Sequence, residues 1–294
     1  MEKAKVYFSK NITPENVIRL YEALGKALPG KVAVKVHSGE KGNQNFLRPK
    51  FMKPMIDAVH GTVVECNTAY GGARNTTDKH IKLMEYHGWS HYFDVDIMDA
   101  EGPDLELEIP DGKQIKKDLV GKNLANYDSM LVLSHFKGHP MGGFGGALKQ
   151  LSIGCASSAG KAYIHSAGKI TDQDVLWDNI APQDAFLESM ADAASSVVKH
   201  FGGNMAYVSI MCNMSVDCDC CAIAEDPCMK DIGILSSLDP VALDQACIDL
   251  VRSSDAPGRD HLLERINSRH GTHTIDAAAD LGFGTKDYEL ISVD

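Results

Sequence analysis

The stretch Ser134–Lys161 reads SHFKGHPMGGFGGALKQLSIGCASSAGK, and the rest of the chain is best interpreted around it. It follows an apolar run, Met130–Leu133, whose composition predicts a buried strand. The five glycines between Gly138 and Gly146 allow the backbone to take positive φ and to approach a ligand closely. The apolar spacing across residues 144–153 predicts a helix that begins inside this Gly-rich loop.

Such a helix would make the loop attractive to an anion. The first N–H groups of a helix and its dipole favour negative charge, and Lys and His side chains lie close by in the sequence. The alternative is a mobile surface loop, but flexible linkers rarely interleave glycine with Lys and His. We therefore predict a pocket for a small anionic molecule. Its predicted catalytic or anion-binding residues are His135, Lys137, His139 and His165, and its predicted cofactor-binding residues are Gly142, Gly143, Gly145, Gly146 and Lys149.

The composition is that of a globular protein. The 294 residues are 44% hydrophobic and 23% charged, which suits one large domain or two modest ones. A net charge of -11 argues against a nucleic-acid partner, which usually requires a basic face. No apolar run approaches the roughly 18 residues that span a bilayer. The N-terminal segment lacks the apolar core of a signal peptide, so we expect a cytoplasmic protein with no membrane partner.

Strands and helices alternate along the chain with short connections. This pattern predicts an α/β fold with a mainly parallel sheet and helices on both faces. A β-hairpin excursion is predicted to turn at Asp111-Gly112. Ligands bind beyond the carboxyl ends of parallel strands, so three polar loops that follow strands, 39–48, 67–77 and 135–146, are expected to meet at one site. We expect one domain over 1–294, with a soft division near Pro182 into a Gly-rich half (1–181) and a cysteine half (182–294).

The individual elements follow from the same periodicities and from capping residues. Besides the strand at 130–133, the predicted strands are 4–8, 32–37, 62–66, 93–98, 105–109, 114–116, 206–211, 232–235 and 288–293. Besides the helix that starts in the Gly-rich loop, the predicted helices are 14–24, 50–60, 77–87, 182–201, 240–251, 260–269 and 275–281.

Eight cysteines are present, and five of them fall within residues 212–228. In a reducing compartment, clustered thiols are more often metal ligands or redox groups than disulfides. Thiolates select zinc, copper(I) or iron–sulfur clusters, although the spacing is neither that of a zinc ribbon nor that of a ferredoxin. Incidental thiols, or vicinal redox pairs, are the alternative. The candidate metal ligands are Cys218, Cys220, Cys221, Cys212, Cys228 and Cys155.

Several of these motifs together resemble one protein family. The Ser134–Lys161 block, the earlier VKVHSGEKGNQNFLRP and NTAYGGARNTTDKH, and the later CDCC and DIGILSSLDPVALDQA are similar to the domain of unknown function 362 family, often labelled iron–sulfur centre proteins. The resemblance implies an α/β fold, a position of Cys218 and Cys220 near the Gly-rich block, and a 4Fe-4S cluster. Many relatives carry a ferredoxin-type insertion, but this chain has no cysteine between Cys155 and Cys212.

The function predicted from the sequence is that of a cytoplasmic iron–sulfur protein with a Gly-rich, Lys- and His-lined pocket. It would act, as an oxidoreductase or through cluster-assisted chemistry, on a small anionic molecule, with a redox protein as a further partner. A non-catalytic carrier of a metal or cluster is the first alternative. A flavin or nucleotide enzyme with a redox dithiol is the second, ranked last because no dinucleotide fingerprint follows the Gly-rich loop. Zinc, or no metal at all, remains open at this stage.

Overall fold

The computed structural model describes residues 3–294 and is built on an eight-stranded sheet in the order β12-β1-β11-β10-β7-β2-β3-β4. Neighbouring strands from β10 to β4 are parallel, as are β1 and β12, whereas β11 is antiparallel to both of its neighbours. The predicted α/β fold with a mainly parallel sheet is confirmed. The strands are β1 (Ala4–Ser9), β2 (Val32–Lys35), β3 (Thr62–Glu65), β4 (Val95–Ile97), β7 (Ser129–His135), β10 (Met205–Met211), β11 (Gly233–Ser237) and β12 (Tyr288–Ser292).

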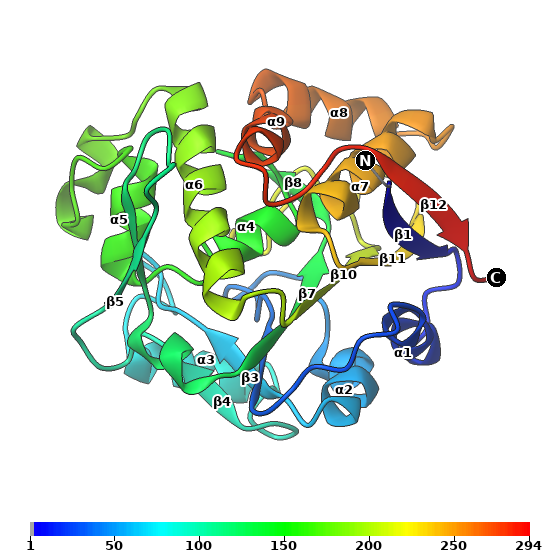
Figure 1. Cartoon of the computed structure of the whole chain (residues 1–294), viewed down its shortest axis with the longest axis horizontal. Helices are drawn as coiled ribbons and strands as arrows, with labels where there is room; N and C mark the ends of the chain where they lie inside the picture. The colour runs from blue at the N-terminus through cyan, green and yellow to red at the C-terminus, as the bar shows by residue number, and fades with distance from the viewer. Residues whose placement is uncertain (1–2) are drawn as a thin grey trace.

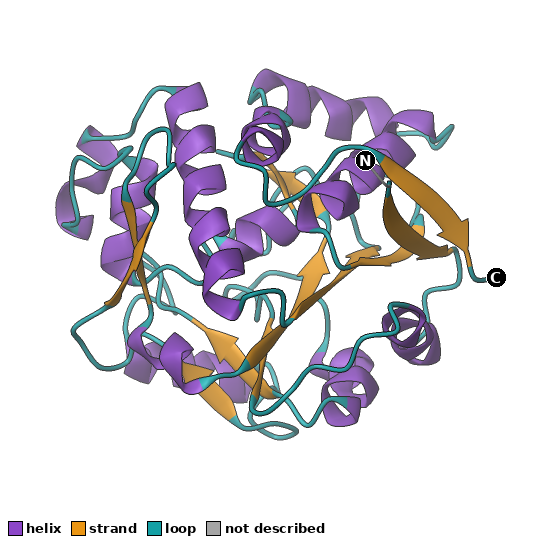
Figure 2. Cartoon of the chain, viewed as in Figure 1, coloured by secondary structure: helices purple, strands orange, loops and turns teal. Residues whose placement is uncertain are grey.

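Helices cover both faces of the sheet, with α1 and α2 on one side and α4, α6 and α7 on the other (Figure 1; Figure 2 shows the same view by element type). Strand β7 shows why both faces are covered, because every one of its residues is buried. Met130 and Val132 pack in the core beneath α6 and α7, and the alternate residues Leu131 and Leu133 pack toward α1 and α2. The helices are α1 (Pro14–Ala23), α2 (Pro49–Ala58), α3 (Thr77–Tyr86), α4 (Ala147–Leu151), α5 (Ser158–His165), α6 (Gln183–Phe201), α7 (Pro240–Ser253), α8 (Arg259–Ser268) and α9 (His273–Asp280), with short 3-10 turns η1 (Lys122–Asn126) and η2 (Gln173–Asp178).

The predicted β-hairpin forms, but its second strand begins later than expected. Strand β5 (Leu105–Glu108) pairs with β6 (Lys117–Val120), and next to this pairing the N–H of Ile109 donates to the carbonyl of Lys116 at 2.8 Å. The backbone N–H groups of Lys113, Gln114 and Ile115 donate to the carboxylate of Asp192 on α6 at 2.8, 2.6 and 3.0 Å. These three residues therefore bond to a helix side chain, and bonding between the two hairpin strands begins beyond them, at Lys116.

The Gly-rich stretch differs from the prediction in one respect. The helix expected there forms as α4, but the loop before it is itself an antiparallel hairpin of β8 (Lys137–His139) and β9 (Gly143–Gly145). Gly143 lies in the turn of this hairpin with φ at +80°, a conformation that glycine adopts readily. Glycine is also needed there because a side chain would meet Gly271 at 2.8 Å. The hairpin fixes the direction of Lys137 and His139, which a mobile loop would not.

Across residues 3–294, no helix combines the length and the apolar character that crossing a membrane requires. The sheet takes strands from both sides of Pro182, and the division proposed there stays a prediction.

Candidate functional site

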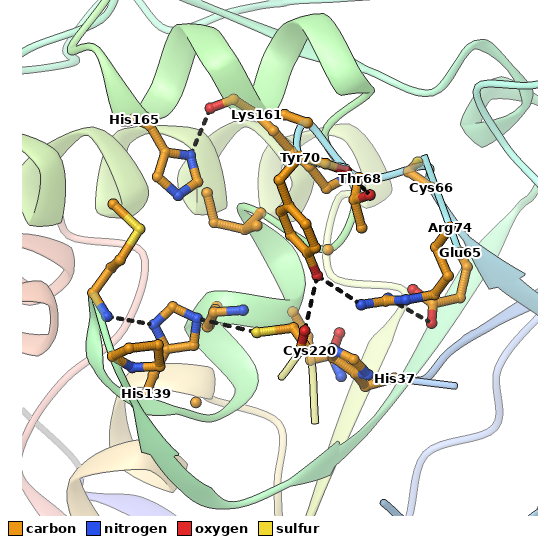
Figure 3. A pocket seen from close by; sticks show the side chains of 18 of the residues that line it. His37, Glu65, Cys66, Thr68, Tyr70, Arg74, His139, Lys161, His165 and Cys220 are labelled. Carbon is orange, nitrogen blue, oxygen red and sulfur yellow. Dashed lines mark hydrogen bonds and ion pairs between the residues drawn. The ribbon is translucent and has the colours of Figure 1, made fainter. Parts of the chain in front are cut away.

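A cavity of about 560 Å³ lies at the carboxyl ends of β2, β3 and β7, where the polar loops were expected to meet. His37 follows β2, Tyr70 and Arg74 come from the loop after β3, and the β8–β9 hairpin after β7 supplies further wall residues. Helices α4 and α5 close the remaining side. Figure 3 shows His139 and Cys220 facing each other across the lower part of the pocket, with His165 and Lys161 above. The other residues used below that line it are Lys35, Glu65, Cys66, Lys137, Gly145, Gly146 and Lys149.

Two cysteines and a histidine lie close together beside the cavity, and His37 and Cys220 belong to its wall. The ligand atoms of His37, Cys218 and Cys220 all lie within 4.8 Å of one another. The backbone N–H of Cys220 donates to Sγ of Cys218 at 3.4 Å, which turns both thiols to the same side. Sγ of Cys220 lies 3.8 Å from Nε2 of His139, so the cysteine loop and the Gly-rich hairpin meet as predicted.

A buried ion cluster holds this cysteine loop in place. Asp219, between the two cysteines, is 1% exposed, and its carboxylate lies 2.9 Å from Nδ1 of His135 and 2.8 Å from Nζ of Lys137. Burial alone would raise the pKa of Asp219, but its contacts with His135 and Lys137 outweigh burial and hold that pKa well below its ordinary value. His135 also contacts the backbone carbonyl of Cys212 at 2.6 Å. His135 thus lies behind the cysteine loop, outside the cavity wall, where it can support the loop.

His139 and His165 are both neutral at physiological pH, and they present opposite ring nitrogens. Burial, reinforced by Lys149, lowers the pKa of His139 to about 4, and Nδ1 accepts N–H groups from Met141 and Gly142 at 3.2 and 2.9 Å. Its proton is therefore on Nε2, the atom that faces Cys220.

His165 has the reverse arrangement. Burial lowers its pKa to about 4 as well, but its Nδ1–H donates to the carbonyl of Lys161 at 2.7 Å. The lone pair on Nε2 is then available as a proton acceptor. The ring stacks on Phe186 with centroids 4.7 Å apart, which fixes its plane. Of these two histidines, His139 thus offers an N–H donor and His165 a basic nitrogen.

The cavity is also rich in cations that differ in their partners. Arg74 is paired with Glu40 at 3.3 Å, and Lys35 with Glu65 at 3.0 Å. For Lys149 and Lys161, by contrast, no carboxylate of residues 3–294 lies within 4 Å of the ammonium nitrogen. Two cations without acidic partners favour an anionic ligand.

The predicted helix-terminus anion site is wrong. The carboxylate of Asp244, on α7, accepts the first N–H groups of α4, from Ala147 and Leu148, at 2.8 and 2.9 Å. A side chain at Gly146 would meet that carboxylate at 2.4 Å, so glycine is required there to let Asp244 approach. Asp244 therefore occupies the N-terminus of α4, where the sequence predicted an anionic ligand.

Sequence comparison gives the family. The family model called Domain of unknown function (DUF362) matches residues 32–249, which include every cavity residue named above. The chain belongs to this family. No curated protein matches it in sequence.

Solved structures show weaker likeness to this DUF362 protein. The lactate racemase apoprotein from Thermoanaerobacterium thermosaccharolyticum is 12% identical, with a TM-score of 0.42, and the match covers 70% of this chain and 50% of that one. A Thermotoga maritima protein is 11% identical, with a TM-score of 0.43, and the match covers 91% of this chain and 58% of that one. The chain thus spans between half and three fifths of the length of these two proteins.

The six predicted metal ligands do not all converge. Among residues 3–294, His37, Cys218 and Cys220 form the one group with mutually close ligand atoms. Cys221 adjoins it, because its N–H donates to the carbonyl of Cys218 at 2.9 Å. Two other candidates bond elsewhere: Sγ of Cys155 to the Gln150 carbonyl at 3.5 Å, and Sγ of Cys228 to the Met214 carbonyl at 3.2 Å. For Cys212, burial raises the pKa of the thiol to about 12.

The predicted pocket residues are likewise only partly assembled. Lys137, His139, Lys149 and His165 line the cavity with Gly145 and Gly146, whereas His135, Gly142 and Gly143 do not contribute to its wall. Their chemical roles stay predictions.

Sequence reasoning missed several residues of this DUF362 site, among them His37, Asp219, Lys161 and Asp244. His37 ends a predicted strand and could have been found by its position at the carboxyl edge of the sheet. Asp219 could have been suspected from its place between two cysteines. Lys161 and Asp244 gave no local signal, because their roles arise from contacts between distant segments.

Proposed function

We propose that this DUF362 protein holds a soft metal, as a single ion or an iron–sulfur cluster, at Cys218 and Cys220, and that it acts on a small anionic molecule in the adjoining cavity. The observation that carries this proposal is the approach of the His37, Cys218 and Cys220 ligand atoms to within 4.8 Å of one another. The same cavity contains Lys149, a cation that lacks a carboxylate partner among residues 3–294.

The donor set fits a single ion more directly than a four-iron cluster. Two zinc–sulfur bonds of about 2.3 Å at a tetrahedral angle place their sulfurs about 3.8 Å apart, which agrees with a group confined within 4.8 Å. A 4Fe-4S cluster usually requires four cysteine thiolates, and this group offers two, with Cys221 adjacent. The thiols are the principal ligands. His37 is the weaker one, because Nδ1 accepts the Gly39 N–H at 3.1 Å and the ring proton must then leave Nε2 before that nitrogen binds metal.

Each remaining residue has a role that follows from its surroundings. A bound metal would supply Lewis acidity or, if it changes oxidation state, electrons. Lys149 attracts the anionic group of the ligand, His165 accepts a proton at Nε2, and His139 donates a hydrogen bond from Nε2–H. A cytoplasmic location, which keeps thiols reduced, and a redox protein partner belong to the same proposal.

The test is purification without oxygen, followed by metal and sulfide analysis and absorption spectroscopy. Iron with acid-labile sulfide would support the cluster, and one zinc or one iron per chain without sulfide would support the single ion. A protein that holds no metal, and takes up none when ferrous or zinc ions are offered, would refute the metal proposal.

A redox dithiol is the second candidate. Its support is that the Cys220 thiol is hydrogen-bonded to its neighbours, and this bond lowers the pKa of the Cys221 thiol. This reading predicts reversible oxidation of two thiols per chain in a metal-free protein. A non-catalytic carrier differs from both, because it would transfer its metal to an apo-acceptor and would turn nothing over.

A further inference from the structure

Lys161 is unusual among the cavity lysines because it is buried without an acidic partner. The residue is 7% exposed, and its ammonium nitrogen bonds to the carbonyl of Ala156 at 2.5 Å. No carboxylate of the described chain lies within 4 Å of it, whereas Lys35 and Lys137, in the same cavity, each have one at 3.0 or 2.8 Å. The fold thus keeps this amine inside the protein without a counter-charge in contact.

Asp99 is the carboxylate with the largest electrostatic effect on Lys161, but it is hydrogen-bonded to other groups. Oδ1 of Asp99 accepts the backbone N–H of Asn67 at 2.8 Å, and Oδ2 accepts that of Ser158 at 3.1 Å. Both oxygens of the Asp99 carboxylate therefore accept a hydrogen bond from a backbone amide.

Burial lowers the pKa of the Lys161 amine and outweighs the charges around it: Cys66, Asp99 and Glu65 oppose the effect, and Lys35 reinforces it. Cys66 can raise the pKa of Lys161 only as a thiolate. Burial raises the pKa of the Cys66 thiol well above its ordinary value, so this thiol is uncharged near neutral pH and does not raise the pKa of Lys161 there. A desolvated lysine beside another cation is the setting in which an amine becomes a nucleophile. Lys161 therefore combines a position on the cavity wall with an amine that is more readily deprotonated than a surface lysine.

We propose that Lys161 is a covalent site for carbonyl compounds and that its amine forms an imine with an aldehyde or ketone that also carries an acidic group. Nζ attacks the carbonyl carbon, a C=N bond replaces the C=O bond, and the carbonyl oxygen leaves as water with the two amine hydrogens. No electrons are gained or lost, so no further reactant is needed. The acidic group of the compound pairs with Lys149, which lines the same cavity as Lys161.

The assignment shares the cavity of the proposed function but does not depend on the metal. If the protein holds no metal, the imine site is unaffected. If no imine forms, the metal site at Cys218 and Cys220 still stands. The two ideas therefore fail separately, and the metal content of the same samples shows which one has failed.

The test uses the full chain with glyoxylate as the probe and sodium cyanoborohydride as the trap, followed by peptide mass mapping. We expect one reduced adduct per chain, on Lys161. Because its pKa is lowered, a larger fraction of Lys161 is free amine near neutral pH, so Lys161 should react faster than exposed lysines such as Lys53. Acetaldehyde, which has no acidic group, should label Lys161 less efficiently than glyoxylate.

Two variants complete the test. Lys161→Arg should abolish the adduct and leave metal content unchanged, and Lys149→Ala should raise the glyoxylate concentration needed for half-labelling by about tenfold. The wild-type peptide map decides the question even if Lys161→Arg does not fold. Labelling spread evenly over exposed lysines, or an unlabelled Lys161 peptide at saturating glyoxylate, would overturn the assignment.

Discussion

Nζ of Lys137 lies 2.8 Å from Oδ2 of Asp219, the residue that separates Cys218 from Cys220. Lys137 belongs to the Gly-rich hairpin and Asp219 to the cysteine loop, so this buried ion pair joins the two segments that were most suggestive in the sequence. His135 contacts the same carboxylate at 2.9 Å. The contacts of Asp219 thus hold in place the loop that carries both thiols.

Replacing Asp219 should therefore lower the free energy of unfolding and weaken metal retention. Asp219→Asn removes the counter-charge of the buried Lys137, and breaking a buried pair in this way costs about 3–5 kcal/mol. Urea unfolding should show a loss of that size together with weaker metal retention. The matched control is Asp217→Asn, because Asp217 pairs with Arg265 in a partly exposed setting and should cost about 1 kcal/mol or less. Equal stability of the two variants would contradict the role given to Asp219.

Lys149 gives the cleanest test of anion binding. Lys149→Ala removes a charge-assisted contact worth about 1.5–3 kcal/mol, which is roughly a tenfold to hundredfold loss of affinity. The fold should be unaffected, because Lys149 is partly exposed and no carboxylate of residues 3–294 pairs with it. Calorimetric titration with oxalate or inorganic phosphate measures the change. Lys149→Arg should keep most of the affinity, and unchanged binding by the alanine variant would remove Lys149 from the site.

The opposite tautomers of His139 and His165 can be observed directly. Long-range proton–nitrogen spectra of the imidazole rings should place the proton of His139 on Nε2 and that of His165 on Nδ1. Because burial lowers the pKa of His165 to about 4, its signals should not shift between about pH 5 and 8. If the His165 ring instead titrates near the ordinary pKa of 6.5, the ring is solvated and its Nε2 is not a buried proton acceptor.

Much of the fold was predictable because it depends on local periodicity. The helix that begins after Asp239, with Pro240 in its first turn, forms as α7, and the apolar run 130–133 is the centre of β7. The meeting of loops at the carboxyl edge followed from the parallel sheet alone.

The parts that failed depend on partners distant in sequence. Asp192 and Asp244 accept backbone N–H groups about 80 and 97 positions away, which displaces a strand in one case and closes a predicted anion site in the other. Cys155 resembled a metal ligand from its motif, but its sulfur faces the Gln150 carbonyl. No local pattern reveals which of several cysteines converge, because tertiary packing decides it.

Asp118 should make folding stability depend on pH. Burial raises its pKa to about 7 from an ordinary value of 3.8, although Ser196 donates to it at 3.2 Å, and its Oδ1 has no partner within the described chain. Between these values the folded state binds the proton that the unfolded state has lost, so stability falls as pH rises from about 4 to 7. Three pKa units correspond to about 4 kcal/mol at most.

Asp118→Asn should remove this dependence. Urea unfolding at several pH values between about 4 and 8 should show that the variant gains stability relative to the wild type as pH rises, by roughly 2–4 kcal/mol. Asp111→Asn, at an exposed position in the hairpin turn, is the control and should follow the wild type. Parallel curves for Asp118→Asn and the wild type would show that Asp118 is ionised in the folded protein.

The most direct test of the central claim is the metal content of two matched proteins purified without oxygen. One carries Cys218→Ser and Cys220→Ser, and the other carries Cys228→Ser, whose thiol lies in the same cysteine window but bonds to the Met214 carbonyl. The arrangement of His37, Cys218 and Cys220 predicts that the double variant loses its metal and that Cys228→Ser retains it at the wild-type ratio. Retention of metal by a folded double variant would contradict the account.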